Sequence, residues 1–69
     1  MLSEETKTIR KKQKLVRDLC KDKEKKLELC EQVAICEELA KPLTETMIKE
    51  LVALPLRQMQ NKIRNYKLV

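Results

Sequence analysis

The sequence predicts an all-α fold, and three of its features lead to this prediction. The 69-residue chain contains no glycine and two prolines, so it lacks the residues that tight β-turns require. Charged residues make up 39% of the chain and aromatic residues 1%, a balance typical of long helices and coiled coils. Apolar residues recur at intervals of three and four, the period of an amphipathic helix. We therefore expect a single helical domain over residues 1–69 with an aliphatic core.

A long N-terminal helix is predicted for residues 3–41. Ser3 is a suitable N-cap, and the two glutamates that follow it favour the positive end of the helix dipole. Pro42 disfavours a helical conformation in the residue before it, so the helix should end at about residue 40 or 41 and a turn should follow.

The apolar stripe of this helix lapses over the six residues between Cys20 and Leu27. No glycine, proline, asparagine or serine lies there to turn the chain. We expect a continuous helix that crosses a solvated patch, with a break at Asp22 as the alternative.

A shorter helical arm is predicted for residues 44–67. Thr44 can cap it, and a stripe of apolar residues continues at steps of three and four through Pro55. Proline interrupts helical hydrogen bonding, so the arm is either one kinked helix or two helices in near register. It should pack back on the long helix as a helical hairpin or small bundle.

The apolar content exceeds what two such arms bury against each other, since 42% of the residues are hydrophobic and a short chain has a small core. We therefore expect oligomerisation to complete the fold, most simply as a dimer. The predicted packing and oligomer face consists of Val16, Leu19, Leu27, Val33, Leu51, Val52, Met59 and Ile63.

Charge is unevenly distributed along the chain, whose net charge is +5. Residues 7–26 contain ten basic and three acidic residues, and residues 57–67 contain four basic residues and no acid. If the arm folds back at Pro42, the helical rise places residues 57–67 beside residues 16–27. The predicted partner-binding patch consists of Lys12, Arg17, Lys23, Lys26, Arg57, Lys62, Arg64 and Lys67.

Several function classes find no support in the composition. There is no histidine and no glycine-rich phosphate loop, so we expect no enzyme, no metal and no cofactor. The three cysteines are read as small buried apolar residues in a reducing compartment, either cytoplasm or nucleus. No apolar run approaches the roughly 20 residues of a membrane-spanning helix.

Two function hypotheses follow. The first is a non-enzymatic interaction module, an adaptor or regulator that self-associates or docks on a helical protein partner without a small-molecule substrate. The second is a small basic regulator that binds nucleic acid. It depends on the segment from Thr44 onward, which resembles a helix-turn-helix: a capped helix, a break at Leu54 and Pro55, and a helix rich in arginine, glutamine and asparagine.

Overall fold

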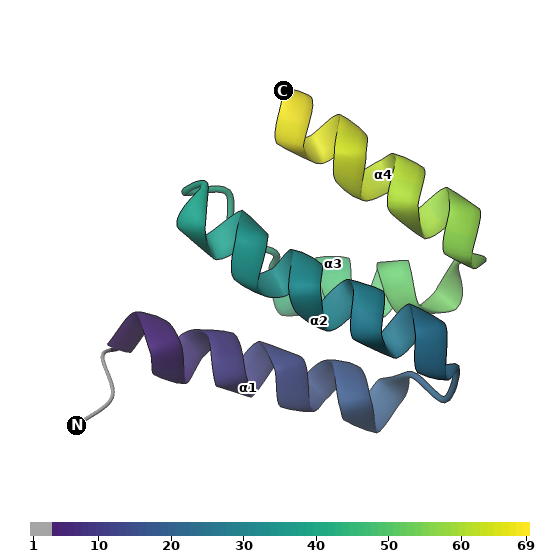
Figure 1. The fold of residues 1–69 in the computed structure, drawn as a ribbon, viewed down its shortest axis with the longest axis horizontal. Helices are drawn as coiled ribbons and strands as arrows, with labels where there is room; N and C mark the ends of the chain where they lie inside the picture. Colours follow the sequence, from purple (N-terminus) through teal and green to yellow (C-terminus); the bar gives the residue numbers. More distant parts are fainter. Residues whose placement is uncertain (1–3) are drawn as a thin grey trace.

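The protein is a bundle of four helices in a computed structural model that describes residues 4–69 (Figure 1). Within that range there is no strand, which confirms the all-α prediction. The proposed cap at Ser3 lies outside the described residues. The helices are α1 (Glu4–Leu19), α2 (Lys23–Glu38), α3 (Glu45–Ala53) and α4 (Leu56–Leu68).

The chain reverses direction between α1 and α2, so the predicted continuous helix over 3–41 is wrong and the alternative break at Asp22 is correct. Asp22 has extended backbone angles, and its side chain accepts a hydrogen bond from the Lys25 N–H at 3.2 Å, as an N-cap does. The solvated stretch offers no apolar side chains to bury. A hairpin instead lets α1 and α2 pack their apolar faces against each other.

α2 ends at Glu38, slightly before the predicted position, and the turn near Pro42 is confirmed. The Lys41 N–H donates to the Cys36 carbonyl and the Ala40 N–H to the Glu37 carbonyl, the hydrogen-bond pattern of a Schellman motif. Ala40 takes the left-handed conformation, φ 59°, that glycine usually adopts at this position. α2 therefore ends through this motif, before the chain reaches Pro42.

The C-terminal arm is two helices rather than one kinked helix. Thr44 caps α3 as predicted, because its side-chain oxygen accepts from the Met47 N–H at 3.2 Å. Leu54 is extended, φ −89° and ψ 150°, the conformation that the following Pro55 favours. The two-residue link therefore turns the chain sharply between α3 and α4.

The core lies where α2 and α3 are covered by α1 on one side and by α4 on the other (Figure 1). Every helix contributes to it, and so does the loop before α3. A single chain thus encloses a core of its own. The buried hydrophobic residues are Val16, Cys20, Leu29, Val33, Cys36, Leu43, Ile48, Leu51, Met59 and Ile63.

Five of the eight residues predicted for the packing face are buried in this core, and Val52 packs partly buried against it. Leu19 and Leu27 are 41% and 59% exposed, so their expected burial within the chain is wrong. α2 is a separate helix that begins at Lys23, and the first of its buried residues is Leu29 and not Leu27. A role for the two exposed leucines in an oligomer stays a prediction.

The cap at Asp22 should carry part of the stability of the hairpin. Asp22→Ala removes the acceptor for the Lys25 N–H and a negative charge at the start of α2, so we expect it to lower the free energy of unfolding by about 1 kcal/mol. Urea denaturation checks this, with Asp18→Ala as the matched control because Asp18 is an exposed aspartate that caps no helix. Equal losses in both variants would contradict the capping role.

Candidate nucleic-acid interface

The outer face of α4 is polar and contains no acid along the whole helix. Met59 and Ile63, one turn apart, are buried and hold the opposite face against α2 and α3. The exposed cations and amides occupy the rest of the helix surface, and two of them, Gln60 and Arg64, border the side that faces α2. The exposed residues of this face are Arg57, Gln58, Gln60, Asn61, Lys62, Arg64 and Asn65.

Polar contacts fix the C-terminal end of α4. The Tyr66 hydroxyl donates to the Pro42 carbonyl at 3.0 Å. The Lys41 ammonium donates to the backbone carbonyl of Lys67 at 2.9 Å and also to that of Val69. A cation at the C-terminus of a helix favours the negative end of its dipole. These bonds tie α4 to the loop that precedes α3.

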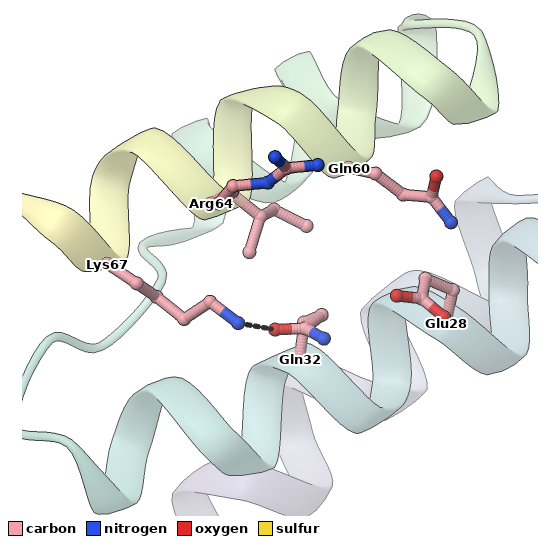
Figure 2. Close-up of a pocket in the computed structure, with 6 residues that line it drawn as sticks. Glu28, Gln32, Gln60, Arg64 and Lys67 are labelled. Atoms are coloured by element: carbon pink, nitrogen blue, oxygen red, sulfur yellow. Dashed lines mark hydrogen bonds between the residues drawn. The ribbon is translucent and has the colours of Figure 1, made fainter.

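A polar groove of about 250 Å³ separates the middle of α4 from α2 (Figure 2). Lys67 reaches across it and donates to the Gln32 side chain at 2.8 Å, and Glu28 on α2 faces Gln60 on α4. The Arg64 side chain extends along α4 toward Gln60. Five of the six residues that line the groove are polar or charged, and Ile63 is the apolar one.

The expected juxtaposition of residues 57–67 with residues 16–27 is wrong. α4 runs alongside α2 in the same direction, so that its cations approach the acidic stretch that contains Glu28 (Figure 1). The break at Asp22, which was the alternative to a continuous helix, adds one reversal of the chain between α1 and α2. Because of this reversal α4 lies beside α2 and not beside the end of α1.

The eight cations of the predicted patch consequently do not share one surface. Lys12 forms a largely buried ion pair with Glu37 across α1 and α2. Arg17 is exposed on α1, whereas Lys23 and Lys26 belong to the first turn of α2. Arg57, Lys62, Arg64 and Lys67 remain together on α4.

Only Lys62 among the cations of the outer face of α4 has a carboxylate partner in the described part of the chain. It lies 3.3 Å from Glu50 of α3, and both side chains are more than half exposed, so solvent screens the pair. Arg57 and Arg64 form no ion pair among residues 4–69. Both guanidinium groups can thus meet an anionic partner without breaking an existing pair.

The sequence showed that residues 7–26 are basic, but of the cations of α1 the predicted patch included Lys12 and Arg17 alone, and a second exposed group was not recognised. The cations of that group lie on the solvent side of α1 and repeat at helical spacing, because Lys14 follows Lys7, and Arg17 follows Arg10, at an interval of seven positions. That heptad spacing was the signal that could have found them. The exposed cations of this α1 face are Lys7, Arg10, Lys11, Lys14 and Arg17.

The three cysteines are free thiols. Burial raises the pKa of Cys30, partly offset by the nearby Arg17 guanidinium, and burial likewise raises the pKa of Cys36 against the opposing effect of Lys67. Both stay protonated near neutral pH, as expected of structural cysteines. Within residues 4–69 no group of three or more potential ligands could hold a metal ion.

These pKa shifts predict a loss of stability in alkali. A folded-state thiol with a pKa above its ordinary value of 9.0 contributes stability that is complete below pH 9 and is lost as the pH rises through the folded pKa. Urea unfolding under reducing conditions at pH 7 and pH 10 should show this loss. It should be smaller in Cys30→Ala/Cys36→Ala, which keeps the same lysines. An identical pH dependence in both proteins would refute the assignment.

No protein family model, curated protein or solved structure matches the chain. No helix within residues 4–69 is both long and apolar enough to cross a membrane.

Proposed function

We propose that the protein is a non-enzymatic module that binds duplex nucleic acid through the outer face of α4. The observation that carries this proposal is the composition of that face, which presents cations and amides and no acid. Cations bind phosphates, and arginine, glutamine and asparagine are the side chains that most often read base edges. A solvated helix face normally mixes both signs of charge, and this one does not.

The attachment of α4 supports the same function. A helix that reads a groove must be held rigidly with one side free, and the buried Met59 and Ile63 together with the bonds to Lys41 and Pro42 meet this need. α3 precedes it through a two-residue link, an arrangement similar to a helix-turn-helix. The major groove of B-DNA, about 12 Å wide, admits one α-helix.

Self-association is the second candidate function. Ile35 of α2 and Leu39, the C-cap residue of that helix, are four residues apart and 39% and 53% exposed, and a second copy or a helical partner could cover them. The core is enclosed within one chain, so self-association would use exposed apolar residues: this pair, or Leu19 and Leu27. Light scattering at micromolar concentration distinguishes an 8.2 kDa monomer from a dimer.

Fluorescence anisotropy with a duplex DNA across a salt series tests the primary proposal. Each phosphate that a cation neutralises contributes about −0.9 to the slope of log affinity against log salt, so a face with several cations should give a steep negative slope. The absence of binding at about 50 mM salt, or an affinity that salt does not change, would overturn the proposal.

A further inference from the structure

α1 carries an exposed face on which cations are concentrated. The five cations of the α1 face lie within roughly a third of the helix circumference, since Lys7, Arg10, Lys11 and Arg17 are each three, four or seven residues from Lys14. Asp18 shares this sector. Two further acids border it: Glu45 of α3 lines a surface hollow with Lys11 and Lys14, and Glu4 lines another with Lys7 and Lys11. Among the described residues none of the five forms an ion pair, and like charges at these spacings repel each other.

This face points away from the bundle. Val16, two residues after Lys14 and hence roughly 200° around the helix axis, is fully buried against the core. α1 packs on α2 and α3 through that buried side. The cations around Lys14 are therefore on the side turned to solvent.

The α1 face and the outer face of α4 are on opposite sides of the molecule. α1 and α4 occupy opposite edges of the bundle, with α2 and α3 between them (Figure 1). Each of the two helices buries its apolar side toward that common middle layer. The two basic faces consequently look in opposite directions.

One duplex cannot engage both faces. The bundle measures 36 × 28 × 18 Å, whereas the persistence length of DNA is about 150 base pairs, so wrapping a duplex around the protein would cost a large bending energy. Two separate duplex segments can each lie against one face without bending. The faces also differ in chemistry, because the α1 face offers cations for phosphates and lacks the amides of α4.

We propose that the α1 face is a second, sequence-independent site for the phosphate backbone, so that one copy of the chain bridges two duplexes. This inference rests on the proposed function of α4 and adds to it a geometry in which the protein brings separate duplex segments together. The bridge needs no dimer, because both faces belong to one chain.

A two-duplex capture experiment tests the bridge. One duplex is immobilised on beads, a second is fluorescent, and the full-length chain is added in amounts below those of the duplexes. The wild-type chain should capture the fluorescent duplex. Arg10→Gln/Lys14→Gln should reduce capture at least tenfold while changing the affinity for a single duplex less than threefold. The matched control, Lys21→Gln/Lys49→Gln, removes two exposed cations outside both basic faces and should capture normally.

The outcomes separate this inference from the function on which it rests. No duplex binding by the wild type would overturn both. Binding of a single duplex without capture would overturn the bridge alone. Capture that persists in Arg10→Gln/Lys14→Gln would also overturn it, since a dimer with two α4 faces would then be the bridge. Thermal melts of the three proteins establish that each variant is folded.

Discussion

Replacing Arg57 and Arg64 together with glutamine is expected to weaken duplex binding by at least about thirtyfold. Each arginine that reads a base edge contributes about 1 to 3 kcal/mol, and each phosphate contact about 0.9 to the salt slope. Neither residue has an ion pair in the described chain, and both are exposed, so the fold should remain intact. Anisotropy titrations at several salt concentrations measure the affinity and the slope together.

The matched control is again Lys21→Gln/Lys49→Gln, which lowers the net charge by the same amount, from +5 to +3 because two cations are removed. It should change the affinity less than threefold if position matters rather than total charge. Equal weakening in both double variants would contradict a specific role for α4, because only the general attraction of a basic protein for DNA would remain. Unfolding of the arginine variant would instead assign Arg57 and Arg64 to the structure.

Composition and periodicity were enough to predict an all-α fold, the Thr44 cap and the turn near Pro42. Each depends on a local property: helix propensity, a side-chain acceptor at an N-cap, or the restriction before proline. Whether the chain continues as one helix or breaks at residues 20–22 depends instead on tertiary packing. Asp22 can continue a helix or cap a new one, and the burial of the apolar faces of α1 and α2 against each other favours the cap.

The reversal of the chain between α1 and α2 explains why the eight cations of the predicted basic patch do not share one surface. The cations of α4 follow one another in sequence, so helical spacing alone brings them onto one helix. Arg17, Lys23 and Lys26 were assigned to the same surface through an expected contact between residues 57–67 and residues 16–27. In the structure α4 lies along α2 instead, and Lys12 pairs with Glu37. Long-range contacts depend on every earlier turn of the chain.

Leu51→Ala is expected to lower the free energy of unfolding by about 2 to 5 kcal/mol, because Leu51 is 1% exposed and its removal leaves a cavity among tightly packed side chains. In a domain of this size each kcal/mol shifts Tm by about 4 to 8 °C, so Tm should fall by at least about 8 °C. Leu27→Ala is the matched control. The same atoms are removed at a site that is 59% exposed, and alanine is the better helix former.

Leu27→Ala should therefore change the free energy of unfolding by no more than about 0.5 kcal/mol at low protein concentration. Similar losses in both variants would contradict the burial pattern. The control also tests the second candidate function, because binding of a second copy stabilises the folded state more as concentration rises. If Leu27→Ala lowers Tm at high concentration but not at low concentration, a second copy covers Leu27. If Tm is unaffected at both, Leu27 takes no part in an interface between copies, and Ile35 and Leu39 remain the apolar pair to test for self-association.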